Sequence, residues 1–170
     1  MENWIVYDIA TGGVCYRASG PAGSSLVQML GEGQALVVVP NAALLGAEID
    51  LAVVRSSLMA RVDIEAEQVR LRFVTGGAGQ AMTYARKEAE ARAWTTDNSA
   101  LTPFLNAEAA ATGQPLAAVA AEVVARADAW VQIGSAIEGT RMGAKAGIDR
   151  AVTLGAIVAA ATVDWSAFGG

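Results

Sequence analysis

The chain has 170 residues and a net charge of −5, and 54% of its residues are apolar whereas only 6% are aromatic. Its one cysteine, Cys15, cannot form an internal disulfide, and the absence of histidine removes both the commonest zinc ligand and the usual general base. The basic residues are not gathered in a patch, which argues against binding to nucleic-acid phosphates.

Residues 1–47 predict a small β-rich docking unit. Two short β-rich runs, residues 4–8 and 14–17, flank Gly12-Gly13, which is typical of a hairpin. Cys15 lies in the second run, where we interpret it as a small apolar residue and not as a reactive thiol. Residues 26–30 predict one short helix, and residues 34–39 a buried strand that ends at proline. A β-β-α-β unit of this size is marginal alone, so we expect it to lean on the helices or on other subunits.

Two amphipathic helices are predicted next. In residues 48–73 apolar residues recur every three or four positions, and the other face carries charges of both signs, which indicates a solvated face with i,i+4 pairs. A glycine-rich loop, residues 75–79, separates this helix from residues 80–95, where an alanine stripe permits close helix packing. The loop lacks the lysine and hydroxyl residue of a phosphate-binding loop and follows a helix, so phosphate binding is not indicated.

A short helix is predicted from Pro103 to Thr112, and Gln114-Pro115 then opens a stretch that runs to about Thr162 without another proline. One continuous helix is favoured, because no turn-forming residue pair interrupts it. The alternative is a break near Gly139–Gly147, where glycine recurs every four residues at a cost of about 1 kcal/mol each relative to alanine.

A mostly apolar seam follows this stretch at steps of three and four, from Val123 in a heptad repeat. A helix of this length would run roughly 70 Å, whereas a compact domain of 170 residues has a radius of gyration of about 15 Å. We therefore expect the helix to be coiled-coil-like and to need a partner along its length. The predicted oligomerisation and packing seam comprises Val123, Ala127, Trp130, Gly134, Ile137, Arg141, Ala144, Ile148, Ala151, Gly155 and Val158.

The run RFVTGGAGQAMTYARKEAEARAW, residues 72–94, resembles a segment of tail-fibre and tail-associated proteins of tailed bacteriophages and related prophages. There the pattern R-[FY]-[IV]-T-x-x-x-G-Q-x-x-x-Y-x-x-K-x-x-[EQ]-A lies between two helices. The resemblance extends to Ala129-Trp130 and residues 137–141, and more loosely to residues 4–8. The chain departs from the pattern at residues 77–79, which read Gly-Ala-Gly where Pro-Gly is expected. The resemblance implies a structural role in the virion without enzymatic activity, as fibre, fibre-to-baseplate adaptor or capsid-attached fibre.

Together these observations predict an α+β fold, with a β-rich docking unit in residues 1–47 and a helical bundle and oligomerisation region in residues 48–170. We expect a homo-oligomer, with a trimer favoured, that is made in the cytoplasm of a bacterial host and contacts other phage tail or baseplate proteins in the virion. No cofactor, metal, catalytic residue, nucleic-acid contact or membrane insertion is expected. The alternatives are a tail-fibre assembly chaperone that binds only transiently and, less favoured, a small nucleotide-binding enzyme that uses residues 76–79.

Overall fold

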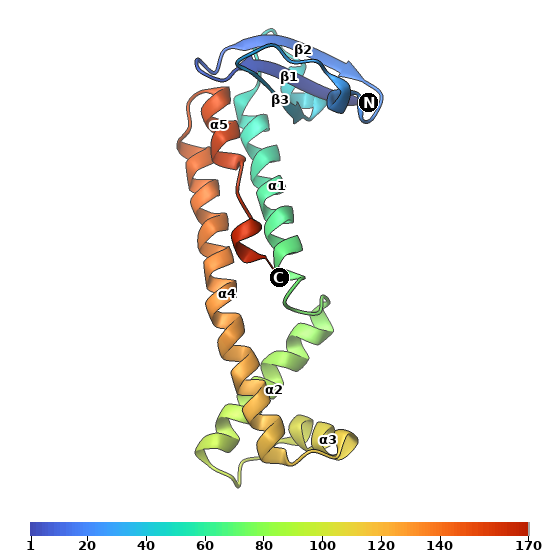
Figure 1. Cartoon of the computed structure of the whole chain (residues 1–170), viewed down its shortest axis with the longest axis vertical. Coiled ribbons are helices and arrows are strands. Elements are labelled where there is room, and N and C mark those ends of the chain that lie inside the picture. The colour runs from blue at the N-terminus through green and yellow to red at the C-terminus, as the bar shows by residue number, and fades with distance from the viewer. Residues whose placement is uncertain (170) are drawn as a thin grey trace. The chain divides into compact units, whose positions relative to one another are not determined.

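The computed structural model describes residues 1–169 and has an α+β fold, with a three-stranded antiparallel sheet followed by five α-helices (Figure 1). The strands are β1 (Glu2–Asp8), β2 (Val14–Gly20) and β3 (Gln34–Val39). The helices are α1 (Leu51–Arg70), α2 (Ala78–Thr96), α3 (Pro103–Thr112), α4 (Leu116–Arg150) and α5 (Leu154–Ala161). Short 3-10 helices lie at Ser24–Val27, Asn41–Leu44 and Ser166–Phe168. The predicted fold class is confirmed.

The chain forms two compact units. The first unit combines Met1–Glu67 with Glu138–Gly169, and the second comprises Gln68–Ile137. The boundary that the sequence suggested, at residue 47, falls inside the first unit, because the sheet and the helices after it share one core. Helix α4 contributes residues to both units.

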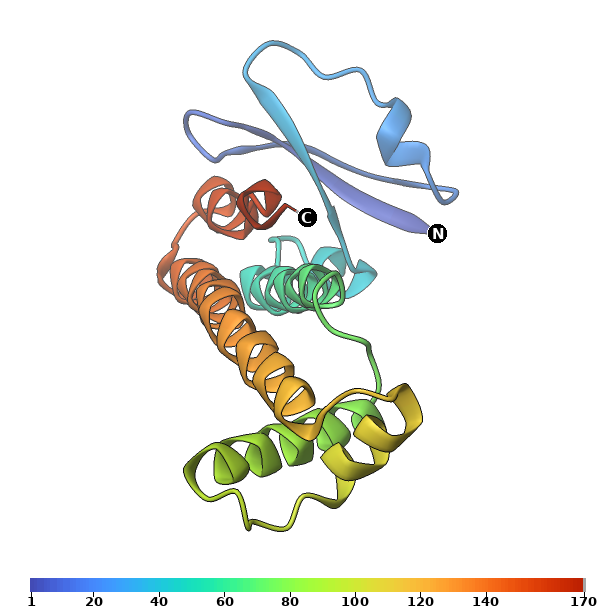
Figure 2. The ribbon, with the colours of Figure 1, turned by 60° about the horizontal axis from the view of Figure 1, so that its bottom comes forward.

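The sheet has the order β2-β1-β3, so the first strand in sequence is the central one. β1 and β2 form the predicted hairpin, and Gly12 in its turn has a φ of 70°, which glycine adopts without strain. Because β2 and β3 both pair antiparallel with β1, the segment between them must cross the sheet. Figure 2 shows this crossover on the side of the sheet away from α1 and α5. The helix predicted at residues 26–30 is a 3-10 turn within the crossover, at Ser24–Val27.

The core of the first unit lies between the sheet, α1, the end of α4 and α5. Successive strand residues point to opposite faces, and Ile5 and Tyr7 of β1 enter this core beside Val37 and Val39 of β3. Trp4, on the other face of β1, is also buried, because the crossover covers it. From the helices the core receives Val54, Leu58, Val62, Ile148, Leu154, Ile157 and Ala161.

The long helix is continuous through its glycines but shorter than predicted. α4 passes Gly139, Gly143 and Gly147 without a break and ends at Arg150, so the prediction of one helix to Thr162 was wrong. Thr153 caps a separate helix, α5, by accepting a hydrogen bond from the N–H of Ala156 at 3.2 Å. Figure 1 shows that α5 then reverses direction beside α4 and α1. The reversal places Leu154, Ile157 and Ala161 of α5 in the core beside the sheet, whereas Ala156 and Ala159 remain exposed.

The second unit contains α2, α3 and the first part of α4. Its core is a cluster of four buried residues, with several half-buried neighbours that include Trp94 and Val123. The buried residues are Ala91, Leu105, Val119 and Ala120. Gly113 ends α3 in the left-handed conformation, with a φ of 69°, which glycine adopts readily.

Candidate functional site

The predicted seam faces the interior of the chain itself. Ile137 and Ile148 are fully buried, and Ile148 belongs to the core of the first unit. The other seam residues are half-buried, and they are Val123, Ala127, Trp130, Gly134, Arg141, Ala144, Ala151, Gly155 and Val158. Since α4 ends at Arg150, the last three members lie beyond it, in the connection and in α5. A partner that bound along the seam would have to displace contacts that the chain makes with itself.

Four glycines of the long stretch fall into two classes. A Cβ atom added at Gly147 would lie 3.1 Å from Cβ of Ala160, and one at Gly155 would lie 3.0 Å from Cα of Gly12. At these two positions the absence of a side chain lets α5 approach α4 and the β1–β2 turn. Added Cβ atoms at Gly139 and Gly143 would meet no atom within 4 Å. Close packing within the chain therefore explains Gly147 and Gly155 but not Gly139 and Gly143.

The charged side of α1 is partly solvated, as expected, and it also makes contacts with other elements of the first unit. Arg55 donates to the carbonyl oxygen of Ala151 at 2.6 Å, and Arg61 donates to that of Ala161 at 3.1 Å. These carbonyls lie at the ends of α4 and α5, where helices leave acceptors without partners. Trp165 donates its indole N–H to Glu65 at 3.0 Å. The i,i+4 pair of Arg61 and Glu65 is also present, at 3.4 Å.

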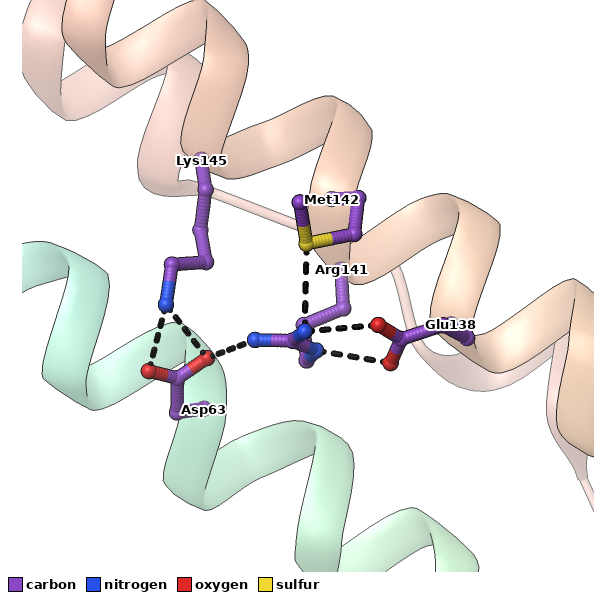
Figure 3. A network of polar contacts seen from close by, with 5 residues as sticks. All are labelled: Asp63, Glu138, Arg141, Met142 and Lys145. Carbon is purple, nitrogen blue, oxygen red and sulfur yellow. Dashed lines mark hydrogen bonds and ion pairs between the residues drawn. The ribbon is translucent and has the colours of Figure 1, made fainter.

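A polar network joins the middle of α1 to α4 within the first unit (Figure 3). Asp63 accepts hydrogen bonds from Lys145, at 2.7 Å and 2.9 Å, and from Arg141. Arg141 also binds Glu138 through two nitrogens, at 2.8 Å and 2.6 Å, which is the bidentate arrangement that favours a fixed guanidinium. The hydrogen bond from Lys145 is the main cause that lowers the pKa of Asp63, and Arg141 lowers it further. The one charged residue of the seam, Arg141, is thus held by acids of its own chain.

A groove of about 600 Å³ lies next to this network. Its charged lining residues are Arg55, Asp63, Lys145 and Asp149, so two cations face two carboxylates. Asp63 and Lys145 already bind each other, and Arg55 binds a helix end. The positive and negative charges that line the groove therefore balance, and most of them already bind other groups of the chain. The groove does not concentrate charge of one sign for a ligand.

In the second unit the polar centre is Glu90, whose side chain is only 3% exposed. One carboxylate oxygen accepts from the main-chain N–H groups of Phe104 and Leu105, at 2.9 Å and 3.2 Å, and the other accepts from Arg86 at 3.1 Å. Glu90 therefore caps the N-terminus of α3 from the neighbouring helix, and a carboxylate there also interacts favourably with the helix dipole. Thr102, which directly precedes α3, makes no side-chain capping bond. Sequence could not reveal Glu90 as the cap, because the two partners lie on different helices.

The residues that carry the resemblance to tail-associated proteins serve the packing of the second unit. Tyr84 donates its hydroxyl to Thr75 at 3.2 Å, which closes the turn before α2. Lys87 forms an ion pair with Glu108 of α3, Glu90 caps α3, and the next residue, Ala91, is buried in the core. These residues of the pattern thus determine how α2 packs against α3.

Three other features could carry chemistry, namely the glycine-rich loop, Cys15 and a second hollow in the surface. In the glycine-rich loop, Gly77 has a φ of 117° and lies directly before α2, so it serves the turn between helices. Cys15 is exposed on β2. A hollow of about 390 Å³ is lined by Phe73, Arg126, Ala129, Trp130 and Ile133, and is mostly apolar with one cation.

Exposed apolar side chains are concentrated in the crossover between β2 and β3. Leu26 is 87% exposed, Val27 77% and Met29 96%, and Leu30 follows at 41%. Scattered exposed apolar residues are normal on soluble proteins, but four within five consecutive positions form a patch of the kind that marks an interaction site. The sequence did not reveal this patch, because residues 26–30 were interpreted as one short helix.

Among residues 1–169, no group of histidine, cysteine, aspartate or glutamate side chains is arranged to hold a metal ion. None of the helices in that range combines the length and the apolar character needed to cross a membrane. Comparisons of the chain with models of protein families, with curated proteins and with solved structures found no match.

Proposed function

We propose that this chain is a non-enzymatic structural protein of a tailed bacteriophage or related prophage, namely a tail-fibre or fibre-adaptor component. The observation that carries the proposal is the exposed apolar segment of the crossover, Leu26 to Leu30, on a sheet whose opposite face is packed on helices. A surface of this kind is energetically costly to leave in water and favours a permanent partner. The resemblance of residues 72–94 to tail-associated proteins is the reason for proposing that this partner belongs to a phage tail.

In this proposal the crossover side of the sheet docks onto another tail or baseplate protein. The protein is made in the cytoplasm of the bacterial host and becomes part of the particle. Self-association belongs to the proposal too, but a contact along the α4 seam competes with packing inside the chain, since Ile137 and Ile148 are fully buried there. Surfaces that remain exposed are better candidates for such contacts.

A tail-fibre assembly chaperone is the second candidate, because an exposed apolar segment would also suit transient binding to an unfolded fibre. Mass spectrometry of purified particles, from the phage or prophage that encodes the chain, separates the two functions. A stoichiometric amount in the particle supports the structural role. Absence from the particle, combined with co-purification with a fibre protein from the infected cell, supports the chaperone. Absence from both overturns the proposal.

A third candidate is a small nucleotide-binding enzyme that uses residues 76–79. In the structure, Gly76 and Gly77 form the turn between α1 and α2. Thermal unfolding with and without nucleoside triphosphates tests this candidate, because a ligand that binds only the folded state raises the unfolding temperature. An unchanged temperature removes it.

A further inference from the structure

The free edge of β3 has main-chain groups that point away from the sheet. The N–H of Ile9 donates to the carbonyl oxygen of Gly33 at 2.8 Å, and the antiparallel register pairs Tyr7 with Ala35 and Ile5 with Val37. In an antiparallel ladder, residues that exchange hydrogen bonds with one neighbour alternate with residues whose bonds point the other way. The N–H and C=O groups of Leu36 and Val38 therefore face outward. Among the described residues no strand pairs with β3 on that side.

This edge lacks the devices that usually protect a strand from pairing with another chain. No charged residue occurs from Gly33 to Ala47, and Pro40 lies after the strand and not within it. The pairing of β1 with β3 has no bulge, and Val38 is 45% exposed. Edges are normally protected by charges, prolines or bulges. The opposite edge strand, β2, shows such protection, since it carries Arg17 and a bulge in its pairing with β1.

We propose that two copies of this chain pair through antiparallel contact of their β3 edges, which joins two three-stranded sheets into one of six strands. In the favoured register, Leu36 of one copy lies opposite Val38 of its partner, and the reverse holds by symmetry. Leu36 and Val38 then exchange four main-chain hydrogen bonds, and apolar side chains meet on the crossover side of both sheets.

A second copy of the chain suits this edge because the edge is uncharged and its hydrogen-bonding groups are self-complementary. The chain has a net charge of −5, so most surfaces of two copies repel each other, whereas the uncharged stretch from Gly33 to Ala47 brings no carboxylates together. The two-fold arrangement is self-complementary, because each strand offers the same outward donors and acceptors to the other. This inference does not depend on the proposed virion role, since it is argued from the main-chain groups of the β3 edge and not from residues 26–30.

Two variants of the full chain test the pairing by analytical ultracentrifugation across the micromolar range. Val38→Lys places a charge at the centre of the contact and should raise the dimer dissociation constant by at least about tenfold. The matched control is Val131→Lys, which adds the same charge at a side chain of α4 that is 54% exposed, and should leave the constant unchanged. Far-ultraviolet circular dichroism verifies that both variants are folded.

Hydrogen exchange of the wild-type chain gives a second measurement that needs no substitution. Protection of the Leu36 and Val38 amides should increase with protein concentration, whereas the Ile5 and Val37 amides, which bond within the sheet, should be protected at every concentration. A wild-type chain that stays monomeric, a dimer equally weakened by both lysine variants, or Leu36 and Val38 amides that exchange independently of concentration would each overturn the proposal.

Discussion

The two compact units differ in what holds them together. The first unit has a core cluster of twelve buried apolar residues between a sheet and three helices, whereas the core cluster of the second has four, two of which are alanines. Because hydrophobic stabilisation grows with the apolar area removed from water, the second unit gains much less from its core. It depends more on the buried carboxylate of Glu90, which caps α3 and binds Arg86. We therefore expect the loss of one polar contact to lower the stability of the second unit more than that of the first.

The tryptophans allow the two units to be followed separately. Trp4 and Trp165 lie in the first unit, and Trp94 and Trp130 lie in the second. Replacing one pair with phenylalanine leaves fluorescence from the other unit alone. Urea unfolding of these two backgrounds provides the reference for the substitutions that follow.

The largest effect is expected from Ile148→Ala, in the first unit. Ile148 is fully buried, so the substitution removes its transfer free energy and leaves a cavity, which costs about 2 to 5 kcal/mol of unfolding free energy. The control is Val131→Ala on the same helix, where an exposed side chain should change stability by less than about 0.5 kcal/mol. A small loss at Ile148, with a shift to lower oligomers, would instead mean that this seam residue contacts a partner and not the core.

Glu90→Ala should produce the next largest effect, and in the second unit. The substitution leaves the N–H groups of Phe104 and Leu105 without their acceptor, at a cost of about 1 to 3 kcal/mol. Glu88→Ala, on the same helix, removes only an exposed pair with Arg92 and should cost less than about 0.5 kcal/mol. Urea unfolding followed by Trp94 and Trp130 measures both. Equal effects of the two substitutions would contradict the capping role and the contrast between the units.

The two classes of glycine predict opposite effects of alanine substitution on the stability of the chain. Gly139→Ala and Gly143→Ala should each stabilise the chain by about 0.5 to 1 kcal/mol, because alanine favours the helix and its Cβ meets no neighbour. Gly155→Ala places a Cβ against the main chain of Gly12, and the strain of overpacking, about 1 to 3 kcal/mol, should outweigh the helix preference. Thermal unfolding of the three variants gives the signs directly. Destabilisation by Gly139→Ala would show that this position needs glycine for a reason outside the folded chain.

The sequence predicted elements better than it predicted the partners of those elements. Apolar periodicity located the strands and helices and showed which side of α4 faces inward, since periodicity depends only on residues of the same element. It could not show that this side faces α1 and α5 in place of another subunit. The end of α4 was missed because neither glycine nor proline marks it. What decides it is a threonine cap at Thr153, together with the bond from Arg55 of α1 to Ala151, which is distant in sequence.

The residues that form contacts between elements were harder to predict from the sequence than the elements themselves. Charges of mixed sign on α1 are compatible with a solvated face or with contacts between helices, and only the placement of Arg141 and Lys145 on a neighbouring helix distinguishes the two. The apolar crossover has the composition of a buried segment, and its exposure follows from its passage over the outside of a small sheet. Both features depend on tertiary structure, which overrides local pattern.

The smallest expected effect concerns the pH dependence of the network at Asp63. Its carboxylate is 41% exposed, so the ion pairs with Lys145 and Arg141 are screened by solvent, and Asp63→Asn should cost no more than about 1 kcal/mol at neutral pH. Folding lowers the pKa of Asp63, so its contribution is fully present above the unfolded value, about 3.9, and is lost as pH falls through the lower folded value. The difference in unfolding free energy between wild type and variant should therefore be constant near neutral pH and shrink in acid. The control is Asp128→Asn, which should act on the fluorescence of the second unit and leave that of the first unchanged. If the Asp63→Asn difference persisted at a pH well below 3, its cause would be packing or helix preference and not the ionised carboxylate that joins α1 to α4.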